Sequence, residues 1–172
     1  MRTIIASVGG TDGDTALAAL LTERLARDAP IAAARVVVED LSGDPTDVAQ
    51  RLEDEWPRFD RVIFVGAVAR DRPAGTVAAY RWDGDASSPA EADEYAPFDT
   101  MLLAVRQLVD VPDEVIIVEL EPDDHDGVRH MSPAVVAGLE RACILSRRFA
   151  TNGSVAADLP RAALGAVRGS LP

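Results

Sequence analysis

The sequence predicts an α/β protein, a three-layer α/β/α sandwich around a mostly parallel, five-stranded twisted sheet. Short apolar runs rich in β-branched residues alternate along the chain with segments whose apolar residues recur at helical spacing. The run at residues 62–67 is apolar without alternation, which is typical of a parallel strand covered by helices on both faces. Strands and helices that alternate in this way are expected to be joined by right-handed crossovers.

The length and composition fit one domain. The chain has 172 residues, of which 48% are hydrophobic and only 5% aromatic, so aliphatic side chains must build the core. We place a single domain over residues 1–150 and a C-terminal tail, weakly helical or disordered, over residues 151–172. Within this tail we expect one weak helix from Leu159 to Val167.

The charge of the chain argues against two classes of partner. All 17 positive residues are arginine, and the net charge is −12, so nucleic acid and anionic membranes would be repelled. No apolar run reaches the length of a membrane span, and the first residues form a strand rather than a signal peptide. Cys143 is the single cysteine and cannot form an internal disulfide, which fits a reducing compartment. We therefore expect a cytoplasmic protein.

The chain opens with a strand, a glycine-rich turn and a helix. The strand is Thr3–Val8, the turn is residues 9–14, and the helix is Thr15–Ala26. A tight turn under a helix N-terminus can hold an anion, but Asp12 and Asp14 stand where a phosphate would bind, which argues against a nucleotide site. For Asp14, a helix cap or a first-turn acid is the alternative to a functional role.

The remaining elements follow from the same patterns. We expect further strands at residues 34–38, 60–67, 76–82 (an edge strand) and 115–120, and helices at residues 46–55, from residue 99 and from residue 133. Residues 83–96 are rich in Asp, Glu, Ser, Ala and Pro without periodicity, which indicates a surface loop. The last helix begins with Ser132 as its cap and Pro133 at its first position.

Polar residues follow the strands at the edge where open α/β sheets bind ligands. These positions carry Asp12 and Asp14, Asp40, Gly66 and the loop of residues 121–130.

The loop holds His125 and His130, which could bind a divalent cation, but their spacing matches no established metal site. A solvated acidic loop is the alternative interpretation of these histidines. Cys143 lies in an apolar run, so we expect a small buried hydrophobe there rather than a nucleophile.

Several segments, in this order and spacing, resemble the [NiFe]-hydrogenase maturation endopeptidases. The resemblance covers roughly residues 3–142 and is carried by the early glycine pair, by VIFVGA at residues 62–67 and by RPAGTV at residues 72–77. Its most specific part is VIIVELEP followed by MSPAVV at residues 131–136.

This resemblance implies a cytoplasmic protein that removes the C-terminal extension of a nickel-loaded hydrogenase large subunit. The nickel belongs to the substrate, so no tightly bound cofactor is expected. The family contacts nickel through an acid after the first turn, an aspartate ending the third strand and a histidine at the start of the next helix. Asp14, or alternatively Asp12, matches the first position, whereas Gly66 and Phe98 stand at the other two. Asp99 matches the acid that commonly follows the histidine.

Two interpretations of the function follow, since two of the three expected nickel contacts are absent. The protein is either a diverged maturation peptidase with a degenerate metal-recognition site, using Asp14 and Asp99 as its carboxylates in a cleft lined by Asp12, Asp40, Gly66 and Phe98, or a non-catalytic module that binds a metalloprotein precursor. A small-molecule reaction in the same cleft is a third class of function, but no motif in the sequence supports it. Nickel favours imidazole and carboxylate, so losing both from one site changes more than affinity.

Overall fold

A computed structural model gives the structure of residues 2–8, 14–34, 36–43, 46, 48, 50, 59–86, 97–108, 110, 112–123, 132–152, 156–164 and 166. The elements of this part of the chain are, in order, β1 (Thr3–Val8), α1 (Asp14–Ala26), α2 (Ala29–Ala33), β2 (Val37–Asp40), β3 (Arg61–Ala67), β4 (Val77–Ala86), α4 (Pro97–Leu108), β5 (Glu114–Leu120), α5 (Pro133–Thr151) and β6 (Arg161–Leu164).

The strands form a single sheet in the order β2-β1-β3-β5-β4-β6. The neighbours from β2 to β5 pair in parallel, β4 pairs antiparallel with β5, and β6 runs parallel to β4. The predicted α/β class and the mostly parallel sheet are therefore confirmed.

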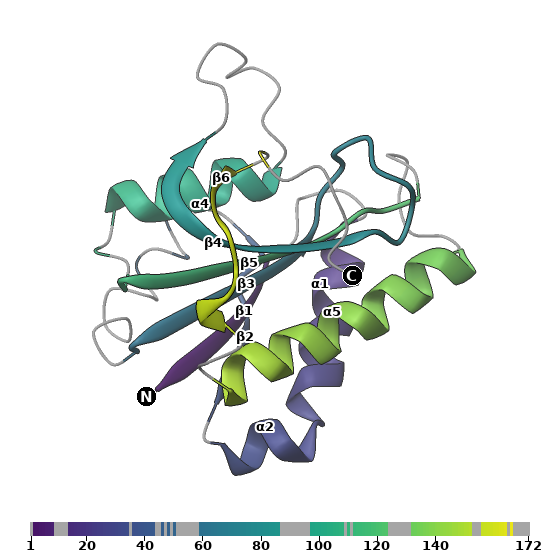
Figure 1. The fold of residues 1–172 in the computed structure, drawn as a ribbon, viewed down its shortest axis with the longest axis horizontal. Helices are drawn as coiled ribbons and strands as arrows, with labels where there is room; N and C mark the ends of the chain where they lie inside the picture. Colours follow the sequence, from purple (N-terminus) through teal and green to yellow (C-terminus); the bar gives the residue numbers. More distant parts are fainter. Residues whose placement is uncertain are drawn as a thin grey trace.

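Helices cover both faces of this sheet, so the protein has three layers. Figure 1 shows α4 above the sheet and α1, α2 and α5 below it. Side chains alternate between the faces: Val115 and Ile117 of β5 pack with α4, whereas Ile116 and Val118 pack with α1 and α5. Every residue of β3 is buried, because helices cover both faces of the sheet. This explains why the sequence of β3 does not alternate between apolar and polar residues.

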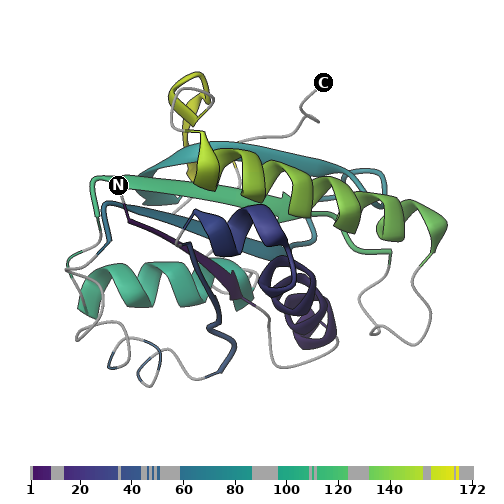
Figure 2. The same ribbon diagram turned by 90° about the horizontal axis from the view of Figure 1, so that it is seen from below.

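The helix after β5 confirms a start signal that the sequence predicted. Ser132 accepts a hydrogen bond from the backbone N–H of Val135 at 3.3 Å, with Pro133 in the first turn of α5. Asp123 fixes the cap in turn, because its carboxylate accepts bonds of 2.7 Å from the backbone N–H and the hydroxyl of Ser132. Figures 1 and 2 both show α5 running along β5.

Two predictions about the end of the sheet were wrong. Residues 76–82 were expected to form an edge strand, but β4 extends to Ala86 and lies between β5 and β6. The weak helix expected from Leu159 to Val167 is replaced by β6, whose sequence RAAL has little intrinsic strand preference. Pairing with β4 at Arg81 and Trp82 decides its conformation.

A close approach of two backbones fixes the segment between β3 and β4 against α5. Gly75 has φ 77°, and a Cβ there would lie 2.1 Å from the carbonyl oxygen of Ala134. The backbone N–H of Gly75 donates to the carbonyl of Glu121, and the Arg141 guanidinium donates to the carbonyl of Gly75, both at 2.8 Å. The segment is therefore held at both its sheet side and its helix side.

Among the described residues, no helix combines the length and the apolar character that a membrane crossing requires.

Candidate functional site

Position 66 lies at the carboxyl end of β3, between two parallel neighbours. Gly66 pairs with Val8 of β1 on one side and with Glu119 of β5 on the other. Paired residues of parallel strands project to the same face, which here is the face covered by α4. This is the end of the sheet at which ligands bind in open α/β folds.

Glu119 brings a carboxylate into this apolar layer. It continues the row of Val115 and Ile117 and is 0% exposed. A buried carboxylate costs several kcal/mol unless it is paired and hydrogen-bonded, so Glu119 requires donors from its neighbours.

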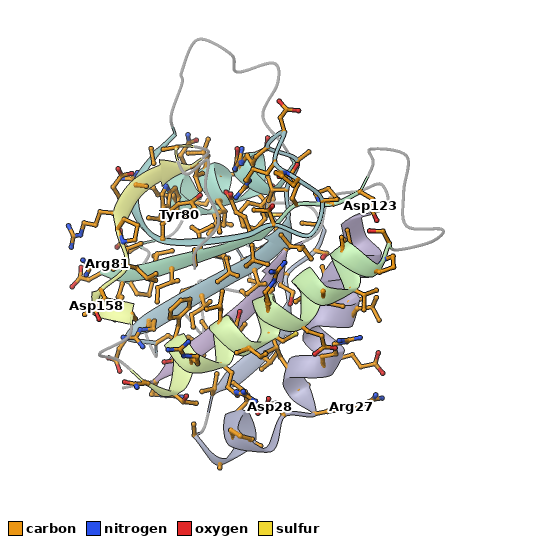
Figure 3. All side chains as sticks on the ribbon, turned by 45° about the vertical axis from the view of Figure 1, so that its right-hand side comes forward. Arg27, Asp28, Tyr80, Arg81, Asp123 and Asp158 are labelled. Atoms are coloured by element: carbon orange, nitrogen blue, oxygen red, sulfur yellow. The ribbon has the colours of Figure 1, made fainter. Side chains whose placement is uncertain are left out.

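Three side chains supply those donors. Arg70 donates to one oxygen of Glu119 at 2.9 Å, and Tyr80 donates its hydroxyl to the same oxygen at 2.8 Å. Arg72 donates to the other oxygen. Figure 3 labels Tyr80, which packs in the core layer between the sheet and α4.

Arg70 also holds the first turn of α4. Its two terminal nitrogens donate to the two oxygens of Asp99, each at 2.7 Å, in a fork-to-fork pair. Asp99 is 2% exposed. Although burial alone would lower the pKa of Arg70, its bonds and charge interactions with Asp99 and Glu119 outweigh burial and raise that pKa above its ordinary value.

A third carboxylate completes the cluster. Glu121 accepts the backbone N–H of Arg70 at 2.9 and 3.0 Å and the Arg72 Nε at 3.2 Å. We call Arg70, Arg72, Tyr80, Asp99, Glu119 and Glu121 the buried ion cluster. With three carboxylates and two guanidiniums it carries one negative charge in excess.

Tyr80 makes the cluster sensitive to alkaline pH. Burial, followed by the charge of Glu119, raises the pKa of Tyr80 far above its ordinary value. An unfolded tyrosine ionises near pH 10 while folded Tyr80 keeps its proton, so its stabilisation is complete below about pH 10 and decreases above it.

We therefore expect the free energy of unfolding of the wild-type protein to fall faster above about pH 10 than that of the Tyr80→Phe variant. The difference between the two slopes should be about 1.4 kcal/mol per pH unit. Urea denaturation of both proteins between about pH 9 and pH 11 measures this difference. Parallel curves for the two proteins would contradict the assignment.

Gly66 and Phe98 fill the rest of this corner with an apolar contact. A Cβ on Gly66 would lie 2.5 and 2.6 Å from two ring carbons of Phe98 and 2.6 Å from the carbonyl oxygen of Val8. Phe98 itself is 2% exposed. The ring therefore occupies the space that a side chain at position 66 would need.

An open pocket of about 190 Å³ lies beside the cluster, between the segments that follow β3 and β5. Its lining consists of Ala69, Asp71, Arg72, Ala74, Glu121, Pro122 and Asp123. Asp123 of this lining is labelled in Figure 3. Asp71 adopts φ 57°, a left-handed conformation that few residues other than glycine adopt, which bends the chain at the pocket wall.

The structure brings together some of the residues that the sequence singled out and separates others. Gly66, Phe98 and Asp99 meet at the start of α4. Asp40 ends β2, two strands away from β3, and accepts the backbone N–H of Ser42 at 2.9 Å.

Several predicted site positions lie outside the described residues. These are Asp12, the side chain of Asp14 at the start of α1, His125 and His130.

The arginines and Glu119 were not predicted as site residues. One signal for them is present in the sequence: Glu119 interrupts the otherwise apolar run of β5, and Arg70 and Arg72 follow an equally apolar strand. A charge within a strand covered on both faces requires buried partners, and a nearby arginine pair is the natural source. Which carboxylates the arginines reach is decided only by the register of β3 on β5.

The described residues of this corner do not fit a nickel ion. Gly66 offers no ligand atom, Phe98 offers a ring, and both oxygens of Asp99 are bound by Arg70. Within the described ranges, no group of three or more His, Cys, Asp or Glu side chains could hold a metal ion.

Cys143 lies half-buried on α5, packed against the core on the side of α1 and α2. Burial raises the pKa of its thiol, so the reactive thiolate is depleted at neutral pH. We expect iodoacetamide to alkylate Cys143 more slowly in the folded protein than in urea at about pH 8, as mass spectrometry over time would measure. Alkylation at equal rates in the folded and unfolded states would show that folding does not protect the Cys143 thiol.

Comparisons with known proteins identify the fold. No protein-family model matches this sequence, and no curated protein matches it. Among solved structures, the [NiFe] hydrogenase maturation protease HycI from Thermococcus kodakarensis KOD1 superposes with a TM-score of 0.61 at 18% identity, over 88% of this chain and 93% of the protease.

Two further solved structures agree with this match. The maturation protease HybD from Thermococcus kodakarensis has a TM-score of 0.59 at 17% identity, over 87% of this chain and 99% of its own. The endopeptidase HycI from Escherichia coli has a TM-score of 0.59 at 17% identity, over 95% of this chain and 98% of its own. The chain therefore has the fold of the [NiFe] hydrogenase maturation proteases.

Proposed function

We propose that this protein is a hydrogenase maturation protease-like protein that acts on the C-terminal segment of a hydrogenase-like large-subunit precursor, through a degenerate metal-recognition site. The observation that carries the proposal is the match in fold along nearly the whole length of solved maturation proteases. The carboxyl edge of β3 and β5, with its pocket beside the buried ion cluster, is the surface that would receive the precursor segment.

The carboxylates divide their tasks under this proposal. Asp99 is held at both oxygens by Arg70, so it fixes the first turn of α4 rather than reaching a substrate. Asp14, with Asp12 as the alternative, is then the acid assigned to the peptide-cleaving step, which requires a group that can take up a proton from water.

A non-catalytic binding module is the second candidate, and a specific contact favours it. Phe98 packs against Gly66, so two of the three positions at which the resemblance implies nickel contacts form a buried apolar contact that offers no metal ligand. A corner without these ligands cannot hold a metal ion that activates water, whereas the binding of a polypeptide segment requires no such ion.

A cleavage assay separates the two candidates. The protein is incubated with the nickel-loaded precursor of a [NiFe] hydrogenase large subunit, and the precursor's intact mass is followed over time. Loss of a C-terminal peptide would establish the protease and sink the binding-module candidate. Complex formation without a change in mass would establish the module, and the absence of both would refute the proposed function.

Two aspartate variants test the assignment of the acid. If cleavage occurs, Asp14→Asn should abolish it, whereas Asp113→Asn should leave it unchanged because Asp113 is exposed and precedes the amino end of β5, away from the carboxyl edge of the sheet. Full activity in Asp14→Asn would move the assignment to Asp12.

A further inference from the structure

Arg70 is a cation built into the chain at the corner where β3, β5 and α4 meet. One guanidinium bridges Asp99 and Glu119, two carboxylates from different elements, with three contacts of 2.7 to 2.9 Å. The same residue is tied down through its backbone, whose N–H donates to Glu121. Its charge is therefore fixed in place from both ends.

Both oxygens of Asp99 already accept from the Arg70 guanidinium, whose positive charge opposes a second cation at the same carboxylate. A metal ion at Asp99 would either lie against this guanidinium or displace it from a fork-to-fork pair whose carboxylate is 4% exposed in its side chain. After displacement the guanidinium would lose one of its two carboxylate partners in a largely buried setting, since the side chain of Arg70 is only 14% exposed. Such a displacement is strongly unfavourable, because an uncompensated buried charge is costly.

The neighbouring positions close the same corner by a different means. Phe98 lies against Gly66, and the contact leaves no space for a ligating side chain on β3. The charge of Arg70 and the position of the Phe98 ring therefore both oppose a metal ion at this corner.

We infer that the site carries its own cation in Arg70, and that the protein recognises the polypeptide of its precursor without reading the nickel it contains. This inference rests on the proposed function for the identity of the partner. It predicts equal recognition of nickel-free and nickel-loaded precursor, whichever of the two candidate functions holds.

Nickel titration of the protein alone tests whether Arg70 keeps a metal ion out of the cluster. Calorimetry with Ni²⁺ up to roughly 1 mM should detect no ion bound at the cluster. An ion whose binding is lost in Asp99→Asn and retained after His125→Ala with His130→Ala would overturn the inference. Binding lost only with the histidine changes would place the ion on the loop of residues 121–130 and would support the exclusion of metal from the cluster.

Precursor binding tests whether recognition is independent of nickel, and it uses only the wild-type protein. The dissociation constant of the wild-type protein is measured by biolayer interferometry for nickel-free and for nickel-loaded large-subunit precursor, with EDTA present for the nickel-free form. The two constants should agree within about twofold, and a preference of roughly tenfold or more for the nickel-loaded form would overturn the inference. If neither form binds, the proposed function fails, and the nickel titration alone decides whether Arg70 excludes the metal.

Discussion

Replacing Arg70 by methionine should lower the free energy of unfolding by about 3–5 kcal/mol. Methionine keeps an unbranched side chain but removes the charge, so Asp99 loses both of its fork contacts and Glu119 loses one of its donors. The cost arises because removing one partner leaves the other carboxylates buried without compensation. Urea denaturation at neutral pH measures it directly.

Arg147→Met is the matched control for this measurement. Arg147 pairs with Asp28 at 3.1 Å, but the two side chains are 37% and 20% exposed, so solvent screens the pair. Its loss should cost no more than about 1 kcal/mol. Equal losses in the two variants would show that burial does not strengthen the contacts of Arg70.

Placing a methyl group on Gly66 should lower the free energy of unfolding by roughly 1–3 kcal/mol. The added Cβ would lie 2.5 Å from the Phe98 ring and 2.6 Å from the carbonyl oxygen of Val8, closer than real Cβ contacts occur. Either the ring or the strand must move to accept it. Thermal and urea denaturation of Gly66→Ala measure the effect.

A double-mutant cycle shows whether Phe98 is the obstacle. Phe98→Leu removes ring atoms near position 66, so the damage from Gly66→Ala should be smaller by roughly 0.5–3 kcal/mol in that background. The carbonyl of Val8 still limits the relief, because backbone in a paired strand cannot rotate away. Strict additivity of the two changes would mean that Phe98 and Gly66 are not packed as described.

The elements that the sequence predicted well are those whose signal is local. β3 and β5 are largely apolar runs, and the Ser132 and Pro133 start signal of α5 acts over a single turn. The short helix α2 was not predicted, although Asp28 caps it by accepting the backbone N–H of Ile31.

The residues of the site were predicted less completely than the strands and helices. Gly66, Phe98 and Asp99 were singled out because the resemblance aligned them with family positions, and the structure does place them in one corner. The partners of Asp99 could not be found in this way, since Arg70 and Glu119 come from segments 29 and 20 residues distant that meet only in the folded sheet. Their proximity depends on the pairing of Gly66 with Glu119.

The sequence by itself determined the α/β class, the positions of the main strands along the chain and the start of α5, because periodicity and capping are properties of neighbouring residues. Only the tertiary structure decided that Ala-rich residues 161–164 become β6, because pairing with β4 supplies the hydrogen bonds that their weak local preference does not. The tertiary structure also decided which charged side chains near β3 pair with one another. Arg70 became the internal counterion of Asp99 and Glu119 because a buried carboxylate is stable only where the fold brings donors to it.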